Sequence, residues 1–409
     1  MAGEKDFFAR ALDEFLPQVQ LPRPEATPSR ASLDSPWTVI LTGSTGSLGT
    51  YILATLQQLP RDKVAKVYCL NRSKDGREKQ NAALTLRGIP PLRDDRFIFL
   101  EAKYDSPRFG LSSGIFNQLL AEATVIIHNA WPVNFVLPGE HFRPSLIGLR
   151  NFLRFSYDSI HHPPLLFVSS LGVAYSSDQR DGKPFAERIH RGLRIPEGYA
   201  QSKYIAELMI DAYAASTGLP AAILRVGQIA GPVKYAGVWP VREWFPTVLR
   251  ASRQLGVLPG NLGTQGRLDW VPVDLLSDIV VEIAEHVVGP SNREAISPMV
   301  FNLTNPQTAP FDSVLPLLLS RIAPKTVPAH EWADLLAEGV ARQPNMPGAK
   351  LVVFYKHAFM PSNPSVLAAT DNLREASKTA CDLPPVNQRW MRLWLEQWGY
   401  GASSTPSRL

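Results

Sequence analysis

Short apolar runs alternate with longer amphipathic stretches along the chain from Trp37 to about Gly231. Six of these runs have the length and the near-continuous hydrophobicity of strands that are buried on both faces. They are "WTVILTG", "AKVYCLNR", "RFIFLEA", "ATVIIHNA", "PPLLFVSS" and "PAAILRVG". Between them lie stretches such as "GTYILATLQQL" and "YIAELMIDAYAAS", whose apolar residues have helical spacing. This alternation predicts an α/β fold with a doubly wound parallel sheet that helices cover on both faces.

The pattern changes on both sides of this region. Residues 1–35 predict a short amphipathic helix, "FFARALDEFL", followed by a linker rich in Pro and Ser. Residues 36–231 form the predicted nucleotide-binding domain, and residues 232–409 form a mostly helical C-terminal lobe. One further strand is expected at "MVFNLTN". The segment of about 267–305 is therefore expected to return to the domain that holds the sheet.

Composition narrows the class of protein without identifying it. Hydrophobic residues make up 45% of the 409 residues, and no apolar run reaches the roughly 18 residues that span a bilayer. The N-terminus lacks a secretory apolar segment, and the two cysteines are far apart, which favours a reducing compartment. We expect a cytoplasmic monomer that binds neither membrane nor nucleic acid. The eight histidines form no ligand pattern, so no metal is expected. The net charge of +5 suits an acidic partner, a phosphorylated cofactor or an ordinary soluble surface.

A glycine-rich loop, "TGSTGSLG", follows the first predicted strand and opens a helix. Its glycines, in GxxGxxG spacing, are Gly43, Gly46 and Gly49. A tight turn and a close backbone approach at this place bring a pyrophosphate onto the helix N-terminus, where free N–H groups and the helix dipole favour anions. The strand–loop–helix context predicts a Rossmann-type dinucleotide site. The candidate contacts are Gly43, Ser44, Thr45, Gly46, Ser47 and Leu48.

The end of the second strand indicates which dinucleotide is bound. NAD-specific sites carry an acid there, about 20 residues after the glycines, to hold the ribose 2′-hydroxyl. This chain has Arg72 at that place, with Lys74 nearby. A guanidinium matches a 2′-phosphate bidentately, which predicts NADPH. The alternative is that Arg72 is a solvated loop charge.

Three more residues at strand ends are candidates for the cofactor site. Asp105 follows the third strand, and its carboxylate either accepts from the adenine amino group or forms a turn. Asn129 and Ala130 end the fourth strand and are expected beside the cofactor. A small residue at 130 lets the chain pass close to the ribose.

The stretch "EGYAQSKYIAE" provides candidate catalytic chemistry. Tyr199 and Lys203 are one helical turn apart, so both side chains project the same way. A neighbouring ammonium is expected to lower the phenol's pKa from about 10 toward neutrality. Ser170, or alternatively Ser169, ends the fifth strand, where its hydroxyl and the Tyr199 hydroxyl can polarise one carbonyl as hydride arrives. The alternative is that the tyrosine and lysine only share a helix surface.

A strand-end serine that follows a glycine loop and precedes Tyr-x-x-x-Lys is the order found in short-chain dehydrogenases/reductases, and this chain resembles an extended member of that family. The stretch "VIIHNAWPVNF" looks like the motif of thioester reductase domains. These domains end many nonribosomal peptide synthetases and fungal carboxylic acid reductases. Further similar stretches are "FVSSLGVA", "RVGQIAGP", "LDWVPVDLLSDIV" and "FNLTNP". The resemblance covers about residues 37 to 305 and thins beyond them.

The resemblance implies NADPH-dependent release of an acyl or peptidyl group from the phosphopantetheine arm of a carrier protein. The product would be an aldehyde or, after a second reduction, an alcohol. By the same resemblance Ser170 and Tyr199 hold the oxyanion, and Lys203 supports Tyr199 and the ribose. Gln228 and Ile229 would lie near the nicotinamide, although the residues alone indicate only a strand end and a turn.

Trp131 and Asn134 follow the fourth strand and are candidates for the border of the thioester channel. The alternative for Trp131 is a core aromatic under a loop.

Three other functions compete with a reductase. A redox-silent relative would release its product by cyclisation, but the relatives of that kind lack the catalytic tyrosine. A sugar-nucleotide epimerase or dehydratase shares the predicted fold but does not match "HNAWPVNF" or Arg72. A non-catalytic NADPH sensor would not need Ser170, Tyr199 and Lys203 together.

Overall fold

The computed structural model describes residues 6–24, 36–93, 95–175, 183–196, 198–289, 297–360 and 366–401. The chain divides into two compact units, each described below by itself. The first consists of residues 1–227, 276–303 and 368–380, and the second of residues 228–275, 304–367 and 381–409. The predicted linker falls mainly on residues 25–35, which lie outside the described residues.

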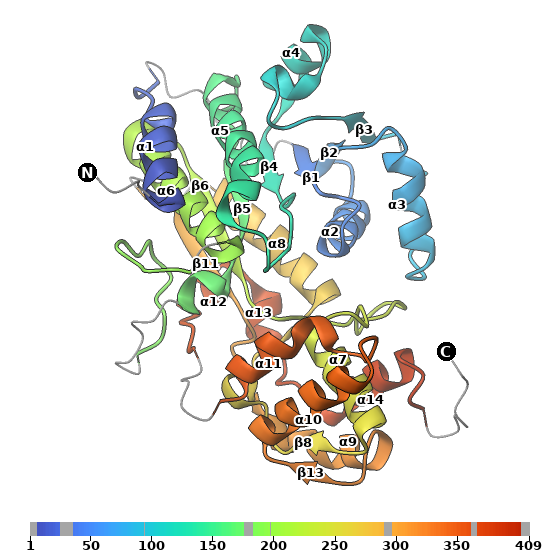
Figure 1. Cartoon of the computed structure of the whole chain (residues 1–409). Coiled ribbons are helices and arrows are strands. Elements are labelled where there is room, and N and C mark those ends of the chain that lie inside the picture. Colours follow the sequence, from blue (N-terminus) through green and yellow to red (C-terminus); the bar gives the residue numbers. More distant parts are fainter. Residues whose placement is uncertain are drawn as a thin grey trace, which may run out of the picture. The chain divides into compact units, whose positions relative to one another are not determined.

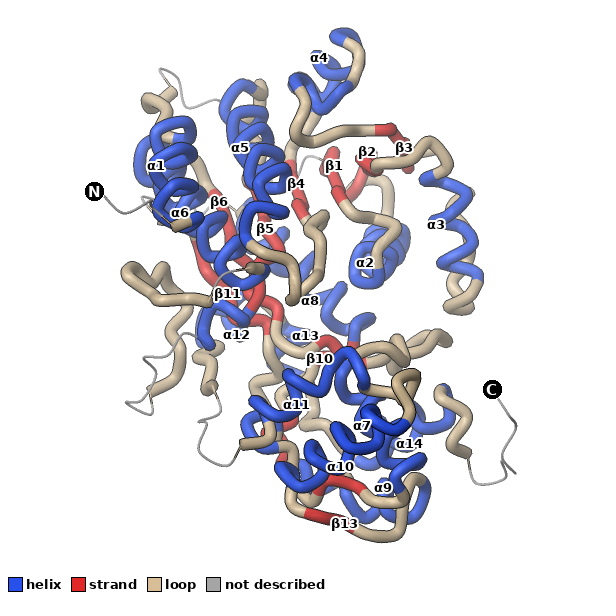
Figure 2. The backbone as a smooth tube through the Cα atoms, in the orientation of Figure 1, coloured by secondary structure: helices blue, strands red, loops and turns tan. Residues whose placement is uncertain are grey.

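A parallel sheet of seven strands forms the centre of the first unit within the described residues, in the order β11-β6-β5-β4-β1-β2-β3 (Figure 2). The bounds are β1 Trp37–Thr42, β2 Val64–Asn71, β3 Phe97–Glu101, β4 Val125–His128, β5 Leu165–Ser170, β6 Ala221–Val226 and β11 Met299–Leu303. All neighbouring pairs are parallel. The predicted doubly wound parallel sheet is confirmed, and each of the seven predicted strands is present.

Helices lie on both faces of this sheet (Figure 1). On one face are α2 (Ser47–Gln58) and α8 (Val273–Val288), which are joined where Thr55 donates to Asp278 Oδ1 at 2.9 Å. On the other face one continuous apolar core includes residues of α1, α4, α5 and α6. The bounds of the first unit's remaining helices are α1 Phe7–Val19, α3 Gly76–Thr85, α4 Ser113–Glu122, α5 Arg143–Asp158, α6 Tyr199–Thr217, α12 Asp371–Ala376 and α13 Lys378–Asp382.

The predicted N-terminal helix is confirmed as α1, and it is part of the core. Its buried residues are Phe7, Ala11, Phe15 and Val19, one helical turn apart. Phe8 stacks on Tyr204 of α6 at 5.6 Å between ring centroids. Gly139 makes room for Phe7, because a Cβ there would lie 2.2 Å from the Phe7 ring. The helix thus packs on the chain around the start of α6.

The second unit is mostly helical and has a core of aromatic side chains. Its helices are α7 Trp244–Leu255, α9 Leu315–Arg321, α10 Ala329–Arg342, α11 Val352–Ala358 and α14 Gln388–Gln397. Its short strands are β7 Ile229–Ala230, β8 Leu258–Pro259, β9 Arg267–Leu268, β10 Val271–Pro272, β12 Ala309–Pro310 and β13 Thr326–Val327. The Trp239 ring packs against Trp270 and Trp394, each at 5.3 Å between centroids. The indole N–H of Trp394 donates to Gly231 O at 3.1 Å, so this core also meets its hydrogen-bonding needs.

Gly49 permits the close contact between the start of α2 and the loop after β1. A Cβ at Gly49 would lie 2.0 Å from Gly43 O, a distance that only a backbone shift can relieve. We expect Gly49→Ala to lower the free energy of unfolding of the first unit by about 1–3 kcal/mol, or more, through overpacking. Urea unfolding followed by circular dichroism measures this change.

The matched control is Gly114→Ala at the start of α4, where no atom lies within 4 Å of the added methyl group. This control should be neutral or slightly stabilising. Equal unfolding midpoints for Gly49→Ala and the wild-type protein would show that the contact between Gly43 and Gly49 is not the constraint described.

Candidate active site

The glycine loop joins β1 to α2 by a turn that requires glycine at its first position. Gly43 has φ +68°, in the left-handed region, and a Cβ there would lie 3.0 Å from the backbone N and Cα of Ala130. The Gly46 N–H donates to Gly43 O at 3.1 Å, and α2 begins at Ser47. The loop therefore leads directly into a helix N-terminus, which is the geometry that favours an anion.

The hydroxyl groups of this loop have different environments. Ser44 is fully buried, and its Oγ donates to Asn71 Oδ1 at 3.2 Å. Thr45, Gly46 and Ser47 are exposed at the loop tip, whereas Leu48 is buried below it. The Ser44 hydroxyl thus ties the loop to the end of β2, and the exposed tip offers the backbone N–H groups and two hydroxyls.

The residues that follow β2 and β3 lie at the carboxyl ends of these parallel strands. Arg72 follows β2 and is exposed, and Asp105 is half-buried in the turn after β3. Tyr104, beside Asp105, donates its hydroxyl to Leu70 O at 2.6 Å. Sequence reasoning missed Tyr104, and only an aromatic residue directly after a strand end pointed to it.

The end of β4 packs against the glycine loop. Asn129 Nδ2 donates to Gly43 O at 3.2 Å, and the Ala130 N–H donates to Thr42 Oγ1 at 3.0 Å. His128 Nδ1 lies 3.0 Å from the same Thr42 hydroxyl, and its other ring nitrogen is buried with no partner among the described residues. Burial and, to a smaller extent, the nearby Lys203 lower the pKa of His128 to about 3, so the ring is neutral. Sequence reasoning missed both Thr42 and His128.

Ser170 and Tyr199 meet where β5 ends and α6 begins. Tyr199 is the first residue of α6 and is 9% exposed, and its phenol is close enough to Ser170 for the serine side chain to influence the phenol's pKa. Ser170 Oγ also accepts from the Gly172 N–H at 3.0 Å. The Tyr199 ring lies edge-on to Phe135 at 5.0 Å and to Phe142 at 6.1 Å between centroids. The structure thus brings the predicted phenol and one predicted serine hydroxyl together.

Lys203 is buried beside them without a directly bonded carboxylate. Its ammonium donates to Val168 O at 2.6 Å and lies 4.4 Å from the Trp131 ring centroid and 4.5 Å from that of Phe167. Burial lowers the pKa of Lys203 well below its usual value, and the charge of Glu207 partly opposes this effect.

The expectation that Lys203 lowers the pKa of Tyr199 is wrong for this structure. Burial raises the pKa of Tyr199 to about 12, and the nearby Ser170 side chain opposes this effect only in part. The ammonium is directed to Val168 O and lies 5.8 Å from the Tyr199 ring centroid. Tyr199 is therefore a neutral phenol, able to donate a proton at neutral pH.

Trp131 contacts the first turn of α6. Its indole N–H donates to Ser202 Oγ at 3.2 Å, and Ser202 Oγ donates to Tyr199 O at 2.7 Å. Asn134 Oδ1 accepts from the Val136 N–H at 3.1 Å, which fixes a local turn. Trp131 thus packs on the first turn of α6, and Asn134 shapes the loop beside it.

The remaining candidates have hydrogen-bond partners or unit assignments of their own. Ser169 is buried and donates to Glu207 Oε1 at 2.6 Å, away from the hydroxyl pair of Ser170 and Tyr199. Gln228 and Ile229 belong to the second unit, where Gln228 Oε1 accepts from the Trp244 indole at 2.6 Å. No group of three or more His, Cys, Asp or Glu side chains among the described residues is placed to hold a metal. Within the same residues, no helix combines the length and hydrophobicity of a membrane span.

Sequence reasoning also missed Glu207 and Arg225, which form a buried ion pair in the first unit. A signal existed for both of them. Arg225 interrupts the apolar run "PAAILRVG", and Glu207 lies one turn after Lys203 on the same helix face.

Comparison with known proteins identifies relatives of the whole chain. A family model described as male sterility protein matches residues 41–280. The chain is 32% identical over 393 residues to a carboxylic acid reductase of Neurospora crassa, an alignment that covers 93% of this chain and 36% of that protein. It is 31% identical over 391 residues to the adenylate-forming reductase Nps10 of Heterobasidion annosum, covering 88% of this chain and 34% of that protein. The chain therefore spans about a third of the length of these relatives.

Solved structures of similar fold include reductase domains of synthetases. The terminal R domain of the myxalamid PKS-NRPS pathway has a TM-score of 0.77 and 23% identity, and the match covers 96% of this chain and 97% of that one. A reductase domain of a nonribosomal peptide synthetase from Mycobacterium tuberculosis has a TM-score of 0.73 and 21% identity, with 96% and 97% covered. At these identities the match shows the fold, which agrees with the resemblance found in the sequence.

The buried position of Lys203 predicts a cost in stability. We expect Lys203→Met, which keeps the length and removes the charge, to raise the free energy of unfolding by about 0.5–2 kcal/mol. The reason is that the wild-type protein must bury an ammonium with only a carbonyl and ring faces around it. Chemical unfolding measures the change. Lys103→Met, at an exposed position, is the control and should change stability by less than about 0.5 kcal/mol. A clear loss of stability in Lys203→Met would contradict this account.

Proposed function

We propose a function for this chain on the premise that it belongs to the male sterility protein family. The proposal is that it is a nicotinamide-dependent oxidoreductase that reduces an acyl thioester. The observation that carries the proposal is the convergence of the Ser170 and Tyr199 hydroxyls at the end of β5, beside a glycine loop. The relatives named carboxylic acid reductase and adenylate-forming reductase support the reaction class.

The nucleotide site fits a dinucleotide by its shape. The left-handed turn at Gly43 and the exposed tip at Thr45 to Ser47 leave backbone N–H groups at the start of α2 open to a pyrophosphate. Arg72 is exposed after β2, where a 2′-phosphate would lie, so we propose NADPH as the cofactor. Bound there, the reduced nicotinamide supplies a hydride.

The protein's own groups act on the thioester carbonyl. Ser170 and Tyr199 donate hydrogen bonds to its oxygen, which stabilises the negative charge that develops there. Tyr199, with a pKa of about 12, is protonated at neutral pH, so its hydroxyl is able to donate this hydrogen bond. Lys203 lies next to the pair and anchors the first turn of α6 through Val168 O.

The overall reaction balances as thioester, NADPH and a proton giving aldehyde, thiol and NADP⁺. The carbon–sulfur bond breaks, and the thiol stays on its carrier. We propose a phosphopantetheine arm of a carrier protein as that carrier, because solved structures of this fold come from nonribosomal peptide synthetases. A further reduction of a retained aldehyde would give the alcohol.

A coupled assay tests the reaction. The wild-type protein should consume NADPH, followed at 340 nm, with an acyl-pantetheine thioester, and chromatography should detect the aldehyde. Tyr199→Phe should lower kcat about 10²–10⁴-fold, because it removes the proton donor and one of the two hydrogen bonds to the oxygen.

The control is Tyr213→Phe. Tyr213 lies farther along α6, and the change removes its buried hydroxyl, which is bonded to Ser156. Its kcat should remain close to that of the wild-type protein. Tight NADPH binding without turnover of any thioester would favour the sensor, and thioester release without NADPH consumption would favour the redox-silent domain.

The choice of NADPH over NADH rests on Arg72. We expect Arg72→Ala to raise the KM for NADPH about 10–100-fold while the KM for NADH changes little, because a charge-assisted hydrogen bond is worth about 1.5–3 kcal/mol. Steady-state kinetics with both cofactors measures the ratio. Lys79→Ala, which removes an exposed cation paired with Asp75 on α3, should leave the ratio unchanged. The same preference for NADPH in Arg72→Ala would exclude Arg72 as the reader of the phosphate.

A further inference from the structure

The catalytic helix contacts β5 at three successive residues of the strand. Tyr199 lies near Ser170, Lys203 donates to Val168 O, and Glu207 accepts from Ser169 Oγ at 2.6 Å. The three α6 residues are each one turn apart, so they form a single stripe facing the strand. The contacts of Tyr199 and Lys203 belong to the proposed catalytic site. The contact between Glu207 and Ser169 has no role in that site.

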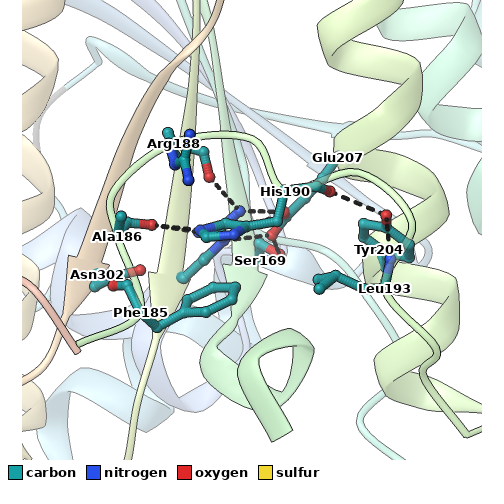
Figure 3. Close-up of polar contacts among 10 residues, drawn as sticks. Ser169, Phe185, Ala186, Arg188, His190, Leu193, Tyr204, Glu207 and Asn302 are labelled. Carbon is teal, nitrogen blue, oxygen red and sulfur yellow. Dashed lines mark hydrogen bonds and ion pairs between the residues drawn. The ribbon is translucent and has the colours of Figure 1, made fainter. Parts of the chain in front are cut away.

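The Glu207 side chain is buried and makes several hydrogen bonds, unlike a carboxylate on a helix surface. It is 1% exposed, and Arg225 of β6 donates to both of its carboxylate oxygens, with Nη2–Oε2 at 2.7 Å and Nε–Oε1 at 3.0 Å. Figure 3 shows Ser169 and Glu207 within this cluster of polar contacts. The carboxylate position is thus fixed by a strand on one side and a strand-end hydroxyl on the other.

The same ion pair also fixes the chain that precedes Tyr199. Arg225 donates to Ala186 O at 3.3 Å and to Arg188 O at 3.0 Å, and its guanidinium lies 4.8 Å from the Phe185 ring centroid. Farther along, the Tyr204 hydroxyl donates to His190 O at 2.9 Å (Figure 3). The approach to Tyr199 is therefore anchored to the elements that hold Glu207.

Stability alone does not account for this arrangement. Taking two charges out of water costs about as much free energy as their attraction returns, so a well-packed apolar pair would serve a core equally well. An apolar pair would lack the directional bond to Ser169. Directional bonds define one register of helix on strand, whereas apolar contacts allow neighbouring ones.

We propose that Ser169 and Glu207, with Arg225 behind them, are positioning residues that set the register of α6 on β5. Ser169 and Ser170 are adjacent, so a movement of α6 that breaks the bond between Ser169 and Glu207 also separates Tyr199 from Ser170. A displacement of about 1 Å at a reacting centre lowers a rate as much as 10²-fold. The inference rests on the proposed function and adds to it residues that touch neither substrate nor cofactor.

The deciding variant is Ser169→Ala. It removes the hydrogen bond and leaves the buried ion pair whole, whereas Glu207→Gln would leave Arg225 without its carboxylate in the interior and threaten the fold itself. We expect Ser169→Ala to lower kcat for an acyl-pantetheine thioester at least 10-fold, with the Kd for NADPH within twofold of the wild-type value. Ser156→Ala is the matched control, since it removes an equally buried hydroxyl, bonded to Pro163 O, and should keep the wild-type kcat.

A double-mutant cycle separates positioning from general damage to the fold. If Ser169 acts through the Tyr199 hydroxyl, adding Ser169→Ala to Tyr199→Phe should lower the residual kcat by less than twofold. Wild-type kcat in Ser169→Ala, or an equal loss in both backgrounds, would overturn the inference and leave the proposed function intact. No thioester turnover by the wild-type protein would overturn both.

Discussion

The closeness of the Tyr199 phenol to Ser170 is the arrangement on which the proposed chemistry of this protein depends. It requires that β5 end where α6 begins, although 28 intervening residues separate the two along the chain. The sheet fixes one partner, because Ser170 pairs with Val226 at the end of a parallel ladder. The helix fixes the other, because the next turn is tied to Val168 O through Lys203. The site therefore uses rigid elements and not a loop to hold its hydroxyls.

Burial gives these groups their properties. The interior keeps Tyr199 protonated and disfavours the charge on Lys203, and both effects come from loss of solvent. A neutral phenol can donate a hydrogen bond, and the Lys203 side chain next to it packs against the faces of Trp131 and Phe167. A buried site of this kind lowers the stability of the fold, a cost that functional sites commonly carry. The glycine loop obeys a related constraint, since Gly43 and Gly49 exclude side chains so that backbone groups can come close.

The sequence predicted what short-range patterns determine. Apolar runs located all seven strands of the sheet, and helical spacing located α1, α2 and α6. The sequence could not predict how deeply each side chain is buried or which distant residues it contacts. Spacing placed Lys203 beside Tyr199 but did not show that the ammonium is directed to Val168 O, so the expected effect on the phenol was wrong. Likewise, Ser169 and Ser170 were equivalent at a strand end until Glu207, 38 residues beyond Ser169, distinguished them.

Transfer of a labelled hydride tests the central claim most directly. The wild-type protein would be supplied with NADPH carrying deuterium at the transferred position of C4, together with an acyl-pantetheine thioester, and the released product analysed by mass spectrometry. The account predicts an aldehyde with one deuterium on its carbonyl carbon, formed in step with NADP⁺. A product released without deuterium, or NADPH that is bound but never oxidised, would contradict it.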